Sequence, residues 1–551
     1  MNRRTSRFGN RFARAVRPLC GLALRVSCLA VMSGAAVLAA VAQDPASAGT
    51  GFEPAPVGQW RTLTSFNDVR DLTIDGEGRV WGATSGGIFV YDPSEGAFER
   101  LLTTADGLPR LDASAIEYYW RSGEVVAGFP DGMLVGIETD GFRVRDVGDI
   151  ERTEAFTNKA VTAIRLAPDG LLISTGFGVV AYDRTFSFVK GSYTAIGGWP
   201  LGTPVNDLSL STGGDSLWVA TDRGVAVGAL GDDLSLSESW NVDGEQVFGG
   251  SPVLQVAPFA GWVHASTAES NYVRTTGGWA AGGPFGTAPA VTDYEVDAAN
   301  SRLIAAQSLR VAVLDGSGAV TIHASANAVA RVHPPAPPGD GQDGSEEPAD
   351  PPGDPFREPG SFWAGTYRAG AFHGPADPQG DPTPARADGP AINAARSIVF
   401  TQEGFIAAST EFSDRNSLYD NQKGFSIVQD GRWTNYNMGT DPVLAAERFT
   451  LTFKAASGPL YHYFGSWGSG IARLDRQTGQ VDVFDAQTSS LRGWEALDPA
   501  FIVASGLQTD SRDDVWSVSR YASRALAHHR EGDPDWTPLD PPAGVGASDL
   551  Y

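Results

Sequence analysis

Short apolar runs separated by glycine-rich turns recur along most of the chain. The stretch from Val69 to Asp92, VRDLTIDGEGRVWGATSGGIFVYD, reads as an apolar strand, a turn, a second apolar strand, a glycine and a third strand. A single copy could not bury its own hydrophobic face, so the copies are expected to pack on one another. The pattern of apolar positions therefore predicts an all-β repeat protein.

The second strand of each copy sets the spacing of the repeat. This strand is almost continuous in apolar and small residues, as expected for a strand that is buried on both faces. Successive copies lie about 45 residues apart in most cases, which is the spacing of β-propeller blades. The seven copies begin at Val80, Val125, Leu171, Leu217, Trp262, Leu303 and Phe362. Seven copies predict one closed seven-bladed propeller, which we place at residues 59–373.

Two segments complete this first ring. The lead-in Gln59–Leu63 has no blade of its own, and we expect it to add the outer strand to the seventh blade and so remove an open edge. The acidic, Pro/Gly-rich stretch 334–360 has almost no apolar residue and is predicted to be a disordered loop within the seventh blade. A second Pro/Gly/Asp-rich stretch, 374–391, is predicted to be the linker that follows the ring.

A second series of blade strands begins after this linker. Its second strands start at Phe405, Leu460 and Asp514, about 55 residues apart, so these blades carry longer loops. Three to four blades fit between residues 392 and 551. We therefore expect an incomplete second propeller and interpret the chain as a fragment of a longer protein.

The first 42 residues have the composition of a signal peptide. Seven arginines and no acidic residue lie before an apolar run, Leu29–Val41, which ends in small residues at Ala42. Export through the Sec route would place the mature chain in the periplasm or at the outer-membrane-associated cell surface. Cleavage would also remove both cysteines, Cys20 and Cys28, so that no disulfide or thiolate chemistry remains.

The charge of the chain excludes one class of partner. The formal net charge is −24, and removal of the basic leader makes it more negative still. A surface of this sign repels nucleic acid and anionic lipid headgroups. Simple solubility or a salty habitat is the favoured explanation for such a charge, so the charge identifies no partner by itself.

The sequence contains few candidates for chemistry. It has no G-x-S-x-G elbow, H-E-x-x-H, P-loop or EF-hand loop. His264 and His462 alternate with apolar residues in blade strands, which favours core or channel-lining histidines over metal ligands. His528 and His529 form a weak metal candidate, but neighbours on a strand point to opposite faces, and we expect this pair in an exposed loop or edge. We predict no catalytic residue, no metal and no cofactor, and the ligand-binding residues stay unassigned.

The tryptophans of the blade strands are expected to pack between blades rather than to stack on carbohydrate. They are Trp81, Trp218, Trp363 and Trp516. The segment from Thr73 to Trp81 comes nearest to the Ser-x-Asp-x-Gly-x-Thr-Trp turn of sialidases, but it differs at the first and seventh positions. A propeller lyase or hydrolase would need a convergent acid/base cluster in the central channel.

Particular motifs resemble a known family. The unit Val69–Asp92 resembles the two-component-regulator propeller repeat, with its Asp-x-x-Gly, Val-Trp-x-x-Thr, Gly-Ile and Tyr-Asp elements in order. The broader sequence resembles PorZ-type proteins of the type IX secretion system. The matching stretches are Trp60–Ser65, Val69–Asp71, Gly86–Asp92, Asp106–Leu108, Val125–Gly132 and Phe464–Ile471.

The resemblance implies a non-enzymatic accessory protein with two seven-bladed propellers and a small C-terminal β-domain. It implies a place at the outer membrane, with sortase-like and porin-like proteins of the secretion complex as partners and with lipopolysaccharide as a further candidate ligand. The alternative is the glycan-sensing periplasmic ectodomain of a hybrid two-component regulator.

Overall fold

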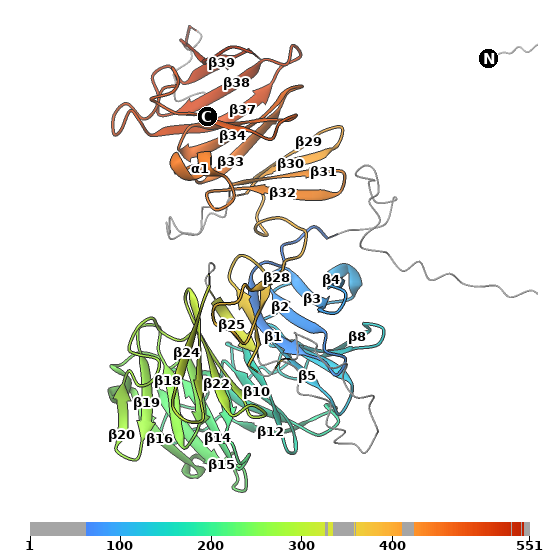
Figure 1. Ribbon diagram of the computed structural model, residues 1–551, viewed down its shortest axis with the longest axis vertical. Helices are drawn as coiled ribbons and strands as arrows, with labels where there is room; N and C mark the ends of the chain where they lie inside the picture. Colours follow the sequence, from blue (N-terminus) through green and yellow to red (C-terminus); the bar gives the residue numbers. More distant parts are fainter. Residues whose placement is uncertain are drawn as a thin grey trace, which may run out of the picture. The chain divides into compact units, whose positions relative to one another are not determined.

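The computed structural model describes residues 62–325, 329–333, 358, 360–409, 424–530, 532–540 and 543–544. The predicted signal peptide and nearly all of the predicted loop 334–360 lie outside these ranges. The described part is almost entirely β-structure, and Figure 1 shows its sheets coloured from blue to red along the chain. None of its helices has the length and apolar character needed to cross a membrane.

Seven four-stranded antiparallel sheets follow one another in the first part of the chain. Each sheet is a hairpin meander in which consecutive strands pair. The sheets are β1 (Val69–Ile74), β2 (Val80–Thr84), β3 (Gly87–Asp92), β4 (Ala97–Leu102); β5 (Ala115–Tyr119), β6 (Glu124–Gly128), β7 (Leu134–Glu138), β8 (Val144–Val147); β9 (Val161–Ala167), β10 (Gly170–Thr175), β11 (Gly178–Tyr182), β12 (Val189–Tyr193); β13 (Val205–Leu210), β14 (Ser216–Thr221), β15 (Gly224–Ala229), β16 (Trp240–Gly244); β17 (Gln255–Phe259), β18 (Trp262–Ser266), β19 (Asn271–Thr275), β20 (Gly278–Ala281); β21 (Asp293–Asp297), β22 (Arg302–Gln307), β23 (Arg310–Asp315), β24 (Val320–Ala324); and β25 (Val329–His333), β26 (Phe362–Thr366), β27 (Ala371–Gly374), β28 (Thr383–Ala385). Three short 3₁₀ helices lie between strands, η1 (Thr104–Asp106), η2 (Ser237–Ser239) and η3 (Glu245–Phe248).

The first strands of these sheets close a ring. Each one contacts the first strand of the next sheet, and β25 of the seventh sheet contacts β1 of the first. The seven copies of the repeat are therefore the blades of one closed propeller, as the sequence predicts. The first strand of each blade lines the central channel.

The hydrophobic core lies between neighbouring blades. One cluster joins Trp81 and Ala83 of the first blade to Val125 and Ala127 of the second, all of them fully buried. Another joins Trp363 of the seventh blade to residues of the first. Because the second strands are packed on both sides by such clusters, every residue of β2, β6, β10, β22 and β26 is buried. In β14 and β18 one or two residues, such as Trp262, are only partly buried or are exposed.

Glycine is required where the third strand begins. Gly87 has φ of +129°, and a Cβ there would lie 2.2 Å from the carbonyl oxygen of Leu102 in the adjacent strand. Gly178 and Gly224 open β11 and β15 with the same conformation and the same close approach. A side chain at these positions would both strain the backbone and separate the third and fourth strands.

The predicted closure of the ring by the N-terminal lead-in is wrong. The outer strand of the seventh blade is β28, which pairs with β27 through Ala371↔Ala385. Thr62 and Leu63 belong to no strand, and Gln59 lies outside the described residues. The seventh blade already takes all four of its strands from its own sequence, so the ring closes through side-chain packing between β1 and its neighbours β25 and β26.

The predicted linker 374–391 also begins too early. Gly374 ends β27, and Thr383–Ala385 form β28, so the connection between the propellers starts after Ala385. The composition concealed this strand because Pro384 stands in its centre. Proline lacks the N–H that a paired strand needs, but an outer strand can turn that side to solvent.

The remaining described residues form three further blades. They are β29 (Ser397–Phe400), β30 (Gly404–Ala408), β31 (Phe425–Gln429), β32 (Arg432–Tyr436); β33 (Thr452–Ser457), β34 (Tyr461–Gly468), β35 (Ile471–Asp475), β36 (Val481–Phe484); and β37 (Ile502–Thr509), β38 (Val515–Arg520), β39 (Leu526–His529), β40 (Thr537–Leu539), with a short helix α1 (Pro442–Ala446) after the first of them. The last two sheets are continuous, because Trp467 and Gly468 at the end of β34 pair with Val503 and Ile502 of β37. An incomplete second propeller thus follows the first.

Candidate functional site: the charged channel of the first propeller

The channel-lining strands carry charged residues at two equivalent positions. Four of the strands can be aligned because a polar side chain near the start of each donates a hydrogen bond to a carbonyl of the following blade: Ser114 to Val161, Thr162 to Val205, Asn206 to Val253 and Thr292 to Val329. The strands of the first and seventh blades align with the fourth through a bulge at the same place. Charged residues then fall into two layers around the axis. The first layer contains Asp71, Asp207, Asp293 and Arg331, and the second contains Glu117, Arg165 and Glu295.

The aspartates of the first layer join neighbouring blades. In each case one carboxylate oxygen accepts the backbone N–H of a residue in the next inner strand. The pairs are Asp71 with Ile116 at 2.9 Å, Asp207 with Val256 at 3.1 Å, and Asp293 with Val332 at 2.9 Å. A repeated position of the blade therefore bonds successive blades along the ring, and charge-assisted hydrogen bonds of this kind are about twice as strong as neutral ones.

Arg165 connects blades across the channel. Its Nη2 lies 3.6 Å from Oδ1 of Asp207 in the adjacent blade and 3.4 Å from Oε2 of Glu295, three blades away around the ring. Its Nη1 donates to the carbonyl of Ile164 at 3.1 Å. The side chains of Arg165 and Glu295 are 19% and 25% exposed, so this ion pair is shielded from bulk solvent.

Burial shifts the proton affinities of these groups. It raises the pKa of Glu117 and that of Glu295 to about 8, although the positive charge of Arg165 opposes both shifts. Burial likewise raises the pKa of Asp71 to about 6. For Arg165, burial alone would lower the pKa, but Glu295 and the aspartates outweigh it and raise it. At neutral pH the channel therefore holds the Arg165 cation together with two carboxyl groups, those of Glu117 and Glu295, that largely retain their protons.

Shifted proton affinities concentrated in a channel are typical of functional sites, but also of structural ion-pair networks. Here the carboxylates of Asp71 and Asp207 accept backbone N–H groups, and the guanidinium of Arg165 is held between two acids. The arrangement can bind and release protons near neutral pH. Its hydrogen bonds and ion pairs otherwise join one blade to another.

These channel residues were missed from the sequence. A signal was present, because Val69-Arg70-Asp71-Leu72 and Val205-Asn206-Asp207-Leu208 share a Val-x-Asp-Leu pattern at the start of a blade. An acid recurring inside an apolar strand has to face either solvent or a partner. The repeat spacing alone does not show that these strands converge on one axis.

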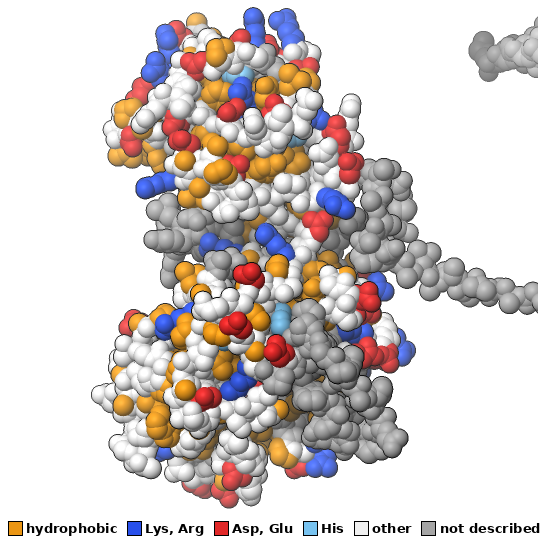
Figure 2. All heavy atoms as spheres, in the orientation of Figure 1, with side chains coloured by type: hydrophobic (Ala, Val, Ile, Leu, Met, Phe, Trp, Pro, Cys, Tyr) orange, Lys and Arg blue, Asp and Glu red, His pale blue; other side chains and the backbone are white. Residues whose placement is uncertain are grey.

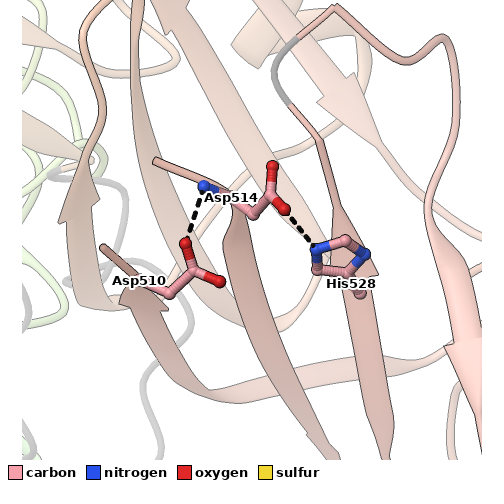
Figure 3. Close-up of side chains that lie close together, drawn as sticks. All are labelled: Asp510, Asp514 and His528. Carbon is pink, nitrogen blue, oxygen red and sulfur yellow. Dashed lines mark hydrogen bonds and ion pairs between the residues drawn. The ribbon is translucent and has the colours of Figure 1, made fainter. Parts of the chain in front are cut away.

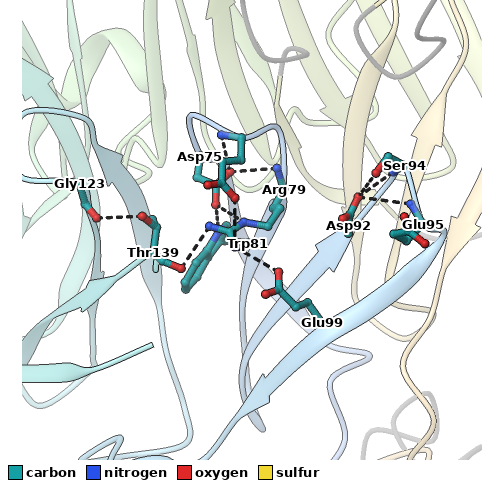
Figure 4. A network of polar contacts seen from close by, with 10 residues as sticks. Asp75, Arg79, Trp81, Asp92, Ser94, Glu95, Glu99, Gly123 and Thr139 are labelled. Atoms are coloured by element: carbon teal, nitrogen blue, oxygen red, sulfur yellow. Dashed lines mark hydrogen bonds and ion pairs between the residues drawn. The ribbon is translucent and has the colours of Figure 1, made fainter. Parts of the chain in front are cut away.

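A second polar cluster lies at the turn that resembles the sialidase motif (Figure 4). The carboxylate of Asp75 accepts the backbone N–H groups of Glu77 and Arg79, the Arg79 Nε at 2.8 Å and the Trp81 Nε1 at 2.8 Å. Arg79 continues to Glu99 at 3.1 Å and to the carbonyl of Thr139 in the second blade at 3.2 Å. The turn holds the indole in place and connects two blades.

The tryptophans lie where the blades meet. Trp81 and Trp363 are fully buried, while Trp218 packs against the core shared by the fourth and fifth blades. Trp516 is half-buried and lies against the His528 ring with a centroid separation of 4.5 Å. These positions fit packing better than stacking on a sugar.

The histidines occupy different environments. His264 is buried against Phe285 and Tyr294, and burial lowers its pKa to about 4. His462 is also buried, with its pKa lowered to about 4 by burial, and its Nδ1 lies 3.0 Å from the Ser457 hydroxyl. The expectation for the His528–His529 pair was wrong, since both belong to β39.

The environments of this pair differ because neighbours on a strand point to opposite faces. His529 is fully buried. The Nε2 of His528 instead lies 3.1 Å from the Asp514 carboxylate.

Elsewhere, on the face shown in Figure 2, acidic and basic side chains are interspersed and form no large region of one sign.

Comparison with known proteins supports the resemblance. Residues 80–241 match the family model described as the TSS9, PorZ, N-terminal beta-propeller domain. A comparison with curated proteins finds no significant match.

Among solved structures, PorZ of Porphyromonas gingivalis, described as an essential bacterial surface component of the type IX secretion system, superposes with a TM-score of 0.67 at 14% identity. The superposition covers 88% of this chain and 60% of that chain, so the present chain spans less than two thirds of the length of PorZ. The extracellular domain of a protein described as a hybrid two-component system of B. thetaiotaomicron gives a TM-score of 0.43 at 12% identity, over 85% of this chain and 59% of that one. The sequence pattern of the PorZ N-terminal propeller is therefore present in residues 80–241 of this chain, within a PorZ-like arrangement of blades.

Proposed function

We propose that this protein is a non-enzymatic, exported propeller scaffold that acts as an accessory component of a type IX-like secretion and surface-attachment complex. The observation that carries the proposal is the match of residues 80–241 to the PorZ N-terminal propeller. The superposition on PorZ extends over 88% of the chain, including the second set of blades, which supports the same fold.

The proposed location is the periplasm or the outer-membrane-associated cell surface, reached by Sec export. The basic and apolar leader of residues 1–42 supports export. The proposed partners are the sortase-like and porin-like proteins of the secretion complex, with lipopolysaccharide as a further ligand.

The channel is consistent with a scaffold. Its aspartates bond one blade to the next, and Arg165 is held by Asp207 and Glu295. An acid/base enzyme would instead be expected to use the carboxyl groups with pKa values near neutrality, Glu117 and Glu295. The two functions therefore differ in what a change at these glutamates does.

A gene deletion in the native host tests the proposal. Loss of the protein is expected to leave secreted cargo unprocessed and detached from the cell surface, as measured by immunoblotting of cell-surface and medium fractions. Affinity purification of the tagged full-length protein from outer membranes is expected to recover secretion-complex proteins. Normal cargo attachment in the deletion strain would overturn the proposal.

Complementation separates the scaffold from an enzyme. A strain that carries Glu117→Gln at normal protein levels is expected to secrete and attach cargo as the unaltered strain does. Loss of attachment with a normally folded and abundant Glu117→Gln protein would instead favour acid/base chemistry in the channel.

A further inference from the structure

Three metal-ligating side chains meet at one end of the last blade (Figure 3). Asp510 follows β37, Asp514 precedes β38, and His528 lies in β39. One ligand atom from each lies within 4.8 Å of the others, and His528 Nε2 is 3.1 Å from Asp514 Oδ2. All three side chains are partly buried.

The same turn occurs in the first blade with a different charge pattern. Asp75 and Asp510 each accept the backbone N–H two residues later, the N–H four residues later, and the indole N–H of the tryptophan six residues later. Four residues after the aspartate, the first blade has Arg79, whose Nε lies 2.8 Å from the carboxylate. The last blade has Asp514 at that position.

The sixth blade also pairs an acid with a cation at the turn between its first two strands, although this turn is one residue longer. There Asp297 lies 2.7 Å from Nε of Arg302, and both side chains are buried. The last blade instead places a second carboxylate beside the first. Two carboxylates that face each other repel unless a cation lies between them.

The arginines near this pair are poorly placed to supply that cation. Nε of Arg530 is 3.8 Å from Asp514 Oδ2, and its side chain is 67% exposed. Exposed pairs at such distances contribute little. Arg512 donates its backbone N–H to Asp510, and its charge acts on that carboxylate less strongly than the hydrogen bonds that the carboxylate accepts.

We propose that Asp510, Asp514 and His528 bind a divalent transition-metal ion, Zn²⁺ being the best match, which replaces the arginine of the equivalent turns. Imidazole and carboxylate ligands suit Zn²⁺, whereas Ca²⁺ prefers oxygen ligands alone. The 3.1 Å separation of His528 Nε2 and Asp514 Oδ2 fits two ligands of one ion with bond lengths of about 2.0–2.2 Å.

Asp510 can serve as the third ligand and keep the hydrogen bonds that hold its turn. Its Oδ1 accepts the backbone N–H groups of Arg512 and Asp514, and its Oδ2 accepts the Trp516 indole N–H at 2.9 Å. A carboxylate oxygen has two lone pairs, so Oδ2 retains one for a metal.

The bound ion would fasten the β37–β38 turn to β39. In the first blade, Arg79 does the comparable work by reaching Glu99 and Thr139. A metal ligated from two sequence-distant segments stabilises the folded blade, because the site does not exist in the unfolded chain. We assign this site a structural role within the second propeller.

Titration calorimetry on the full chain, stripped of metal with EDTA, tests the assignment. The expected result is one Zn²⁺ bound per chain at this site, no comparable binding of Ca²⁺, and a higher thermal unfolding temperature with Zn²⁺. Asp514→Arg recreates the first-blade pair and is expected to fold while losing this binding event. His528→Gln is expected to weaken Zn²⁺ affinity by more than about 10-fold.

Asp92→Asn serves as the matched control, because Asp92 is a partly buried acid at the end of β3 in the first blade (Figure 4), and this variant is expected to bind Zn²⁺ as the unaltered chain does. Zn²⁺ binding that is equal in the unaltered chain and in His528→Gln would overturn the proposal, as would an unaltered chain that shows no binding. His528→Gln keeps the test decisive if Asp514→Arg does not fold.

Discussion

Replacing Arg165 by methionine tests the role of the cross-channel ion pair. The change keeps most of the side-chain length but removes the cation that lies 3.6 Å from Asp207 and 3.4 Å from Glu295. Removing one partner of a buried ion pair costs about 3–5 kcal/mol, because the other charge stays buried and uncompensated. Since the Arg165 and Glu295 side chains are 19% and 25% exposed, we expect the lower end of that range, about 3 kcal/mol, at a pH above about 8, where Glu295 is ionised.

The loss is expected to depend on pH. Glu295, with a folded pKa of about 8, is largely protonated and neutral near pH 5, so the missing cation matters less there. At about pH 8 or above, a larger fraction of Glu295 is ionised. The free energy of unfolding of Arg165→Met is then expected to fall further below that of the unaltered chain. The double variant Arg165→Met/Glu295→Gln is expected to recover part of the loss.

Thermal unfolding followed by circular dichroism measures this effect. A loss of about 3 kcal/mol corresponds to a shift of roughly 4–5 °C for a domain of about 300 residues. The cycle of two single variants and the double variant isolates the coupling between Arg165 and Glu295. A shift below about 1 °C, a deficit independent of pH, or strictly additive variants would refute the reasoning.

Three further changes probe other parts of the fold. Gly87→Ala is expected to lower the free energy of unfolding by more than about 3 kcal/mol, because the new Cβ would lie 2.2 Å from a carbonyl oxygen of β4. Gly123→Ala, at a position with φ of +66° and open space around it, is expected to lower it by about 1 kcal/mol. Equal losses of stability in thermal unfolding would contradict this reasoning. Trp81→Phe removes the indole donor to Asp75 and is expected to cost about 1–3 kcal/mol in the same assay, and a stability unchanged from the unaltered chain would show that this hydrogen bond is dispensable. Glu117 has a folded pKa raised to about 8, so its contribution to stability is fully present below about pH 4.5 and is lost as the pH rises through about 8. Glu117→Gln is therefore expected to flatten the dependence of the unfolding temperature on pH. A curve parallel to that of the unaltered chain would contradict this expectation.

The second strands could be predicted from the sequence because their pattern is local. The expected core of the first copy, Val80–Thr84, coincides with β2, and burial on both faces accounts for its unbroken run of apolar and small residues. The outer strands carry a weaker signal. In β4, Glu99 and Arg100 are exposed, and in β28 a proline interrupts the strand, so the seventh blade was assigned the wrong outer strand.

The charged channel and the metal-ligating cluster depend on distances that the sequence does not contain. Arg165 meets Glu295 only because the blades curve into a ring. His528 meets Asp514 because β39 pairs with β38, which places Val515 opposite His529. The period of a repeat shows which residues occupy equivalent positions in different blades. Which of them come into contact depends on how the ring closes and on the register of the paired strands.

The closure of the first ring without a shared strand has an evolutionary consequence. Each of the seven sheets takes its strands from one uninterrupted stretch of sequence. Among the described residues, the first and last blades meet through packing and through polar contacts such as the hydrogen bond from Gly370 N–H to the carbonyl of Asn67, without sharing a strand. An in-frame duplication or deletion that begins and ends between blades leaves every sheet whole. Blade number in such a protein can therefore change by whole units during descent, with the cost confined to refitting one interface.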